Sequence, residues 1–184
     1  YKQGAALTNL FLADEINRTS SKTQSALLEV MEEGKVTVDG ITHKMPDPYI
    51  VIATQNPVGS IGTQMLPESQ MDRFIVRLTM GYPNIESEVA MLKSKQNLVP
   101  VDNVRPVVSA EDILQARKVV ENIYVSDQVF QYIVMLANAT RNNEYIKLGL
   151  SPRGTIALLR MTKATALLKG RDYVIPDDVI YSLS

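Results

Sequence analysis

The stretch Leu10-Phe-Leu-Ala-Asp-Glu15 decides the fold, because four apolar residues are followed at once by two acids. An apolar run of this length is typical of a buried strand in a parallel sheet. A second run, Tyr49-Ile-Val-Ile-Ala53, has the same character and is followed by Thr54-Gln-Asn56. Open α/β sheets bind their ligands at the carboxyl edge of the strands. We therefore expect the polar residues that follow both strands to meet at that edge.

Composition and charge place the chain among folded globular proteins. Of its 184 residues, 45% are hydrophobic and 21% are charged, and 19 Lys+Arg offset 20 Asp+Glu to a net charge of −1. Such a balance provides no overall field for a nucleic acid. The absence of cysteine excludes disulfides, thiolate zinc sites and cysteine nucleophiles, and favours a reducing compartment. Apolar runs fall far short of the ~20 residues of a membrane span, and no signal-peptide pattern opens the chain. We expect a cytoplasmic protein with no membrane span and no nucleic-acid partner.

Turn and cap signals predict an α/β arrangement in the first part of the chain. Ser20 is a typical helix cap and Gly34 a typical helix end, with apolar residues at helical spacing between them. Asp39-Gly40 lies between two alternating segments, as in a β-hairpin. The further elements expected up to residue 81 are a helix over 21–33, a hairpin over 35–44, a strand over 49–53, a short helix over 67–72 and a final strand over 75–79.

A change of character follows Gly81-Tyr-Pro-Asn84, whose residues are typical of a turn. Beyond it, serine caps and helix-starting prolines precede amphipathic stretches. The expected helices cover 84–95, 110–122, 127–142 and 152–169, and a last one begins at Pro176. We therefore predict one domain over residues 1–81 and an all-helical domain over residues 82–184.

The acidic pair at the end of the first strand suggests phosphoryl transfer to water. Neighbouring side chains on an extended chain point in different directions, so one of the two carboxylates of Asp14 and Glu15 can approach a metal while the other orients a water. Asn56 adds an amide that can hold this water or touch a γ-phosphate. Two other interpretations stay open from the local pattern: an acid pair is also typical of a helix start or a solvated turn, and Asn-Pro is a common turn former.

Several motifs, in the order found here, resemble those of the MoxR family of AAA+ ATPases. The resemblance covers essentially the whole chain and implies an α/β P-loop NTPase (AAA+) core, truncated at its N-terminus, followed by an all-α helical lid. The segments that carry it are Leu10–Arg18, Lys22–Glu29, Ala53–Pro57, Gly62–Thr63, Leu66–Glu68, Met71–Phe74, Leu150–Gly154 and Gly170–Val174.

The resemblance implies roles for five residues. Asp14 and Glu15 resemble the end of a Walker B motif, in which Asp14 binds Mg²⁺ through water and Glu15 polarises the hydrolytic water. Asn56 resembles sensor 1. Arg73 resembles the arginine finger that reaches the γ-phosphate bound in the next subunit of a ring, and Arg153 resembles sensor 2 on the lid. The hairpin around Asp39-Gly40, which contains His43 as an ordinary solvated residue, resembles the hairpin that faces the pore or a partner in this clade.

The local sequence allows a purely structural interpretation of Arg73 and favours a functional role for Arg153. Arg73 could simply pair with Asp72 or Glu68 at the surface, which contributes little stability. Arg153 stands at the second position of a predicted helix, where a cation is disfavoured by the helix dipole. A residue placed against local preference favours a functional explanation.

As a MoxR-like protein, the chain would bind ATP and Mg²⁺, hydrolyse ATP to ADP and phosphate, and act as a chaperone-like remodelling motor. The resemblance also implies a ring-shaped homo-oligomer and protein clients, with von Willebrand factor A domain proteins among the candidates. Alternatives are a magnesium-chelatase-like motor subunit, a non-hydrolysing partner-binding scaffold and a replicative helicase. The form Ala53-Thr-Gln-Asn-Pro57 favours MoxR over a chelatase. A helicase should carry a basic hairpin, whereas Lys35 and Lys44 are offset by Asp39 and Asp47.

One element of the family is not found within these residues. The family binds phosphates with a glycine-rich loop that ends in Gly-Lys-Thr or Gly-Lys-Ser, and no such segment occurs here. The opening Tyr1-Lys-Gln-Gly-Ala5 resembles the segment just before Walker B, so we expect the loop upstream of it. Residues 1–184 alone are therefore expected to be inactive as an ATPase.

Overall fold

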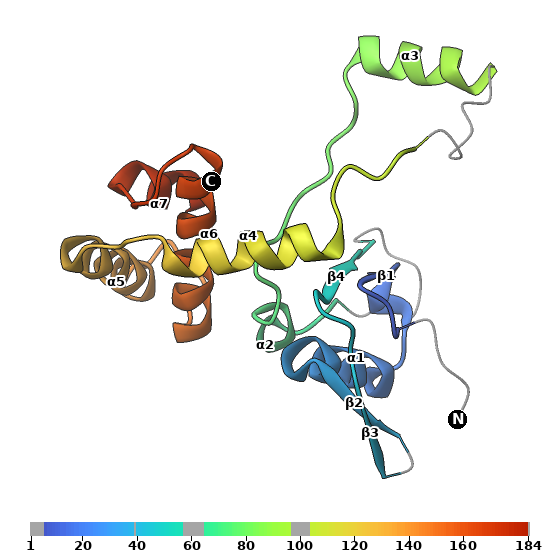
Figure 1. The fold of residues 1–184 in the computed structure, drawn as a ribbon, viewed down its shortest axis with the longest axis horizontal. Helices are drawn as coiled ribbons and strands as arrows, with labels where there is room; N and C mark the ends of the chain where they lie inside the picture. Colours follow the sequence, from blue (N-terminus) through green and yellow to red (C-terminus); the bar gives the residue numbers. More distant parts are fainter. Residues whose placement is uncertain (1–5, 39, 57–64, 97–103, 184) are drawn as a thin grey trace. The chain divides into compact units, whose positions relative to one another are not determined.

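A computed structural model describes residues 6–38, 40–56, 65–96 and 104–183 (Figure 1). The chain divides into two units. The first contains Tyr1–Ile75 together with Ala110–Ser184, and the second contains Val76–Ser109. Each unit is described by itself below. Within the described ranges, no helix is both long and apolar enough to cross a membrane.

Two short parallel strands form the sheet that the sequence predicts. Strand β1 (Leu10–Ala13) pairs with β4 (Ile50–Ala53), in a register that matches Leu10 with Ile50 and Ala13 with Ala53. The prediction that both runs are fully buried is wrong, because Leu12 is 61% and Ile52 50% exposed. Side chains alternate between the two faces of a strand. The described residues half-bury the face that carries Phe11 and Val51 and leave the other face open.

Helix α1 (Ser21–Glu33) follows β1 through a 3₁₀ turn, η1 (Ile16–Arg18). The predicted cap is confirmed, since the Ser20 hydroxyl accepts a hydrogen bond from the backbone N–H of Thr23 at 3.2 Å. Gly34 ends the helix at φ +61°, in the left-handed region that glycine adopts without strain. The buried Gln24 amide donates to the backbone oxygen of Ile16 at 3.2 Å, which ties the start of α1 to the exit from β1.

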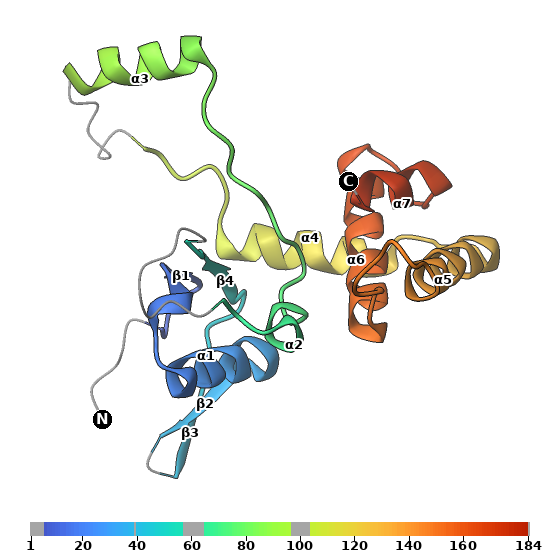
Figure 2. The ribbon, with the colours of Figure 1, turned by 180° about the vertical axis from the view of Figure 1, so that it is seen from behind.

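The predicted hairpin projects from the end of α1, away from β1 and β4 (Figure 2). Strands β2 (Lys35–Val38) and β3 (Ile41–Lys44) are antiparallel, and Lys35 lies opposite Lys44. Gly40 has φ +76°, as the tight turn requires. The other turn residue, Asp39, lies outside the described residues.

After the sheet, the predicted short helix is confirmed as α2 (Glu68–Met71). The predicted strand over 75–79 is wrong, because these residues form no regular structure. A strand needs a neighbour for its backbone N–H and C=O groups. In the described part of the chain, β1 and β4 pair with each other alone, and so do β2 and β3.

The second unit, Val76–Ser109, contains helix α3 (Ile85–Gln96), which confirms the helix predicted over 84–95. Asn84 begins it, since its side-chain oxygen accepts a hydrogen bond from the backbone N–H of Ser87 at 2.8 Å.

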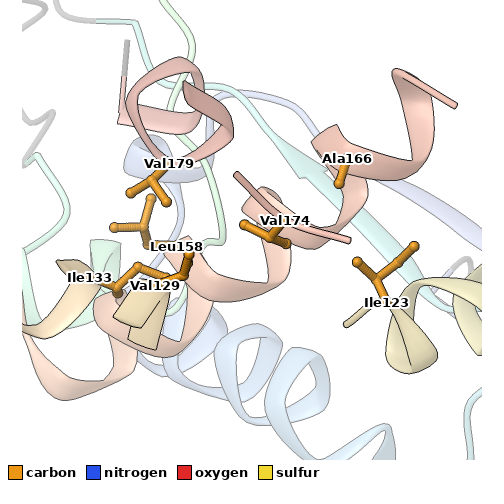
Figure 3. Packing of buried hydrophobic residues seen from close by; sticks show 7 residues of the cluster. All are labelled: Ile123, Val129, Ile133, Leu158, Ala166, Val174 and Val179. Carbon is orange, nitrogen blue, oxygen red and sulfur yellow. The ribbon is translucent and has the colours of Figure 1, made fainter. Parts of the chain in front are cut away.

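Four helices in the C-terminal part of the first unit confirm the remaining predictions. They are α4 (Ala110–Asn122), α5 (Asp127–Arg141), α6 (Pro152–Leu168) and α7 (Pro176–Leu183). Residues of α5, α6 and α7, with Ile123 and Val174 from the joining segments, form one core cluster (Figure 3), made of Ile123, Val129, Ile133, Leu158, Ala166, Val174 and Val179.

A buried carboxylate fastens α7 to the end of α6. Asp178 is fully buried and accepts hydrogen bonds from both terminal nitrogens of Arg171 and, at 3.0 Å, from the backbone N–H of Ile175. Lys169 lies 3.3 Å away from the same carboxylate. The Arg171 guanidinium in particular lowers the pKa of Asp178 from 3.8 to about 2, against the opposing effect of burial.

We predict that Asp178→Asn lowers the free energy of unfolding at pH 7 by about 2 kcal/mol, because the buried side chain loses the negative charge that Arg171 stabilises. The folded pKa is depressed, so this contribution is present above pH 4 and fades as the pH falls toward 2. Urea unfolding at pH 7 and at pH 3 measures both effects. The matched control is Asp177→Asn, an exposed neighbour in the same helical turn. Equal stability of the two variants at pH 7 would contradict the assignment.

Candidate functional site

The polar residues that follow β1 and β4 meet at one sheet edge, as the sequence predicts. The Thr54 hydroxyl donates to a carboxylate oxygen of Asp14 at 2.6 Å and accepts the backbone N–H of Glu15 at 2.8 Å. The backbone pairing continues past the strands, with Thr54 N–H on the oxygen of Ala13 and Ile16 N–H on the oxygen of Thr54, both at 3.0 Å. One threonine therefore fixes the side chain of one acid and the backbone of the next.

Glu15 adopts a left-handed backbone conformation, with φ 47° and ψ 49°. This conformation is uncommon for a residue with a side chain, and its cost must be offset by surrounding contacts. One Glu15 carboxylate oxygen lies 3.4 Å from the side-chain amide nitrogen of Asn56, and the other lies 3.0 Å from Arg18. Asp14, Glu15 and Asn56 are thus brought together, although their roles in catalysis stay predictions.

A second asparagine holds the backbone of Asn56. Asn17 is 2% exposed, and its amide nitrogen donates to the backbone oxygen of Asn56 at 3.2 Å. Its side-chain oxygen accepts the backbone N–H of Asn56 at 3.3 Å. Sequence reasoning placed Thr54 at this edge without giving it a role, and it did not single out Asn17. The available signal was their position, since each is a polar residue two positions from a predicted site residue, near the end of a strand.

The chemistry of this edge suits a hydrated magnesium ion. Carboxylate oxygens are the ligands that Mg²⁺ prefers, and it usually keeps several waters while binding one or two carboxylates and substrate phosphates. Asp14 is exposed and Glu15 is half-buried. In the described ranges, no group of three or more His, Cys, Asp or Glu side chains could hold a metal ion. The donor set therefore fits an ion that is held largely through water and phosphate.

The two predicted arginines lie together, on a single carboxylate of α1. Arg73 binds one oxygen of Glu32 through Nη1, and Arg153 binds the other oxygen through Nη2. Arg73 therefore does form a partly exposed ion pair, but the partners considered for it, Asp72 and Glu68, are wrong. Asp72 instead accepts a hydrogen bond from the Ser151 hydroxyl at 2.7 Å, and Glu68 lies 3.5 Å from Lys147. Arg73 and Glu32 also line a hollow of about 340 Å³ beside α1 and α2.

The arginine pair and the acidic cluster occupy opposite ends of α1. An α-helix rises 1.5 Å per residue, so Glu32 lies roughly 16 Å along the helix from Ser21. The start of this helix is tied to the exit from β1 by Gln24. The structure therefore brings the five predicted residues into two groups, with Asp14, Glu15 and Asn56 in one and Arg73 and Arg153 in the other.

Comparison with known proteins agrees with this architecture. Residues 1–76 match the ATPase family associated with various cellular activities (AAA), and residues 138–181 match the AAA lid domain. A crystal structure of a candidate ATPase from Cytophaga hutchinsonii superposes with a TM-score of 0.90 and 39% sequence identity. It covers 98% of this chain, which in turn covers 57% of that protein.

Two curated relatives are similar along nearly the whole chain. The uncharacterized protein YeaC of Bacillus subtilis is 50% identical over 98% of the chain, and the chaperone MoxR1 of Mycobacterium tuberculosis is 39% identical over 96%. The chain spans about half the length of these relatives, 57% of the first and 49% of the second. Magnesium-chelatase subunits are more distant, at 25–26% identity.

We predict that Thr54→Val destabilises the sheet edge by about 1–3 kcal/mol, because the Glu15 N–H and the Asp14 carboxylate both lose their partner. Amide hydrogen exchange at Glu15 should become faster, while Thr54→Ser, which keeps the hydroxyl, should behave like the parent protein. Hydrogen exchange followed by mass spectrometry, together with urea unfolding, measures the two effects. Unchanged exchange at Glu15 in Thr54→Val would show that the hydroxyl does not hold this backbone.

Proposed function

The chain belongs to the MoxR type of AAA+ ATPases, and we propose that the protein hydrolyses ATP with Mg²⁺ and uses the energy to remodel or assemble partner proteins. The observation that carries this proposal is the meeting of Asp14, Glu15 and Asn56 at the carboxyl edge of β1 and β4. Two carboxylates and an amide at this edge can serve a hydrated metal and an attacking water together.

Each residue of the cluster has a separate task in this proposal. When bound, Mg·ATP supplies the phosphoryl group and a metal that neutralises charge on the phosphates. Asp14 holds the metal's water shell through its carboxylate. Glu15 orients and polarises the attacking water. The Asn56 amide lies beside the Glu15 carboxylate and holds both the carboxylate and the water in position. Thr54 and Asn17 act as positioning residues for this group.

Arg73 and Arg153 are proposed to act on phosphate as finger and sensor 2. Both arginines are separated from Glu15 by most of the length of α1. This separation supports a role for Arg73 on the nucleotide of a neighbouring subunit, and hence a ring-shaped homo-oligomer. We further propose residues 1–81 as part of the ATPase core and residues 82–184 as the lid.

The clients are proposed to be proteins in the cytoplasm, with von Willebrand factor A domain proteins among them. The name of the relative MoxR1, a chaperone, supports this class of function. A magnesium-chelatase-like motor is the second candidate, supported by relatives at 25–26% identity, against 39–50% for MoxR1 and YeaC. A non-hydrolysing scaffold is the outcome if the protein binds ATP without turning it over.

In the full-length protein, we expect Glu15→Gln to lower ATP turnover by about 10²-fold or more while Mg²⁺-dependent nucleotide binding is kept. The amide keeps the shape of the side chain but cannot polarise the water. Steady-state phosphate release and nucleotide titration separate the two effects, with Glu29→Gln on the exposed surface of α1 as the control. A normal rate in Glu15→Gln would remove this residue from the mechanism.

Arg73→Ala should abolish most turnover with little change in nucleotide affinity, because an arginine finger contributes roughly 10³–10⁵ in rate. Mixing Arg73→Ala subunits with Glu15→Gln subunits should restore part of the activity, since some interfaces then combine an intact finger with an intact glutamate. Rings of either variant alone should stay inactive. A mixture that exchanges subunits and yet remains inactive would argue that Arg73 serves its own subunit.

A further inference from the structure

We propose that Glu32, near the end of α1, is the positioning residue for the arginine pair Arg73 and Arg153. In this role it holds the two guanidinium groups side by side so that one subunit presents them together to phosphate. The inference rests on the proposed ATPase function for its catalytic consequence. The juxtaposition itself comes from the two ion pairs on one carboxylate.

The geometry divides the carboxylate between the two arginines. Arg73 takes one oxygen and Arg153 takes the other, each through a single terminal nitrogen. A guanidinium carries five N–H donors on three nitrogens, so each arginine keeps further donors for an anion. Glu32 can therefore hold both groups without using up their capacity to bind phosphate.

Electrostatics explains why the pair needs such a residue. Two guanidinium groups that converge on one point repel each other, and the carboxylate between them lowers their combined charge to +1. Arg153 has a second unfavourable interaction, because it stands in the first turn of α6, where the helix dipole disfavours a cation. The negative charge of Glu32 offsets both the repulsion between the two guanidinium groups and the unfavourable interaction of Arg153 with the helix dipole.

Rigid elements set the position of this carboxylate. Glu32 lies in the last turn of the thirteen-residue helix α1, whose far end is fastened to the exit from β1. A further hydrogen bond joins the two segments that carry the arginines, since Ser151 caps α6 and also donates to Asp72, the residue before Arg73. Catalytic groups that are held by helices are placed more accurately than groups on loops.

Replacement of Glu32 by glutamine should release one of the two arginines. The amide has the same shape as the carboxylate, but it retains one acceptor oxygen and turns an NH₂ donor toward the second guanidinium. A displacement of about 1 Å in a catalytic group can cost up to about 10²-fold in rate. The loss should appear in turnover, since the finger acts chiefly in the transition state.

The test compares Glu32→Gln with Glu33→Gln in the full-length ATPase. Glu33 is the adjacent residue and has its own ion pair, with Lys35 at 3.2 Å, so the control removes the same charge without touching the arginines. We expect kcat to fall by about tenfold to 10²-fold in Glu32→Gln, with a change of less than about threefold in the Kd for Mg·ATP. Glu33→Gln should match the parent in both.

Two further measurements separate positioning from a general loss of structure. In an Arg73→Ala background, Glu32→Gln should lower the residual turnover much less than it does alone, because the group that it positions is already gone. Hydrogen exchange at Gly154 and Thr155, in the first turn of α6, should become faster in Glu32→Gln and stay unchanged in Glu33→Gln. This readout requires no ATP turnover.

The outcomes are distinguishable. If Glu15→Gln is inactive but Glu32→Gln turns over ATP like Glu33→Gln, the positioning role is wrong and the ATPase function stands. If the parent protein fails to hydrolyse ATP, the proposed function is wrong, and unchanged exchange in the first turn of α6 would then overturn the placement of Arg153 by Glu32 as well.

Discussion

The parallel pairing of β1 with β4 is the constraint on which the candidate site depends. Four matched residue pairs, whose members are 40 positions apart in the sequence, bring the ends of the two strands to the same edge. Beyond the last pair, Thr54 continues the pairing with both its backbone and its hydroxyl. The left-handed turn at Glu15 is held by these bonds, so the direction of the acidic side chains follows from the register of the strands.

Helix α1 sets the distance between the acidic cluster and the arginine pair. It begins directly beyond the acidic cluster, and its last turn carries the carboxylate that binds Arg73 and Arg153. A helix of this length is a stiff spacer, so the distance between the two groups is fixed by the number of residues rather than by contacts along the way. Insertion or deletion within α1 would change both the distance and the direction of Glu32 relative to Asp14.

Local signals predicted most of the helices and strands, because helix capping depends on residues that are close together in the sequence. Ser20, Ser126 and Ser151 each accept the backbone hydrogen bond that a helix start requires. The meeting of Asp14, Glu15 and Asn56 was also predictable, since it follows from two parallel strands. What failed depended on neighbours: residues 75–79 have strand-like composition but no strand partner among the described residues, and Leu12 and Ile52 are half-exposed instead of buried. The joint binding of Arg73 and Arg153 by Glu32 could not be predicted, because residues from three distant parts of the chain meet there and no local pattern records it.

The hydroxyl of Ser151 has a consequence for how the lid helices can move. Its lone pair caps α6 through the N–H of Gly154, whereas its proton serves Asp72 near α2. The first bond is internal to the helix and would survive a rotation of α6, whereas the second would be broken by such a rotation. The Ser151 hydroxyl would then donate a hydrogen bond to water instead, at a net cost on the order of 1 kcal/mol. The cap of α6 therefore does not depend on the bond to Asp72.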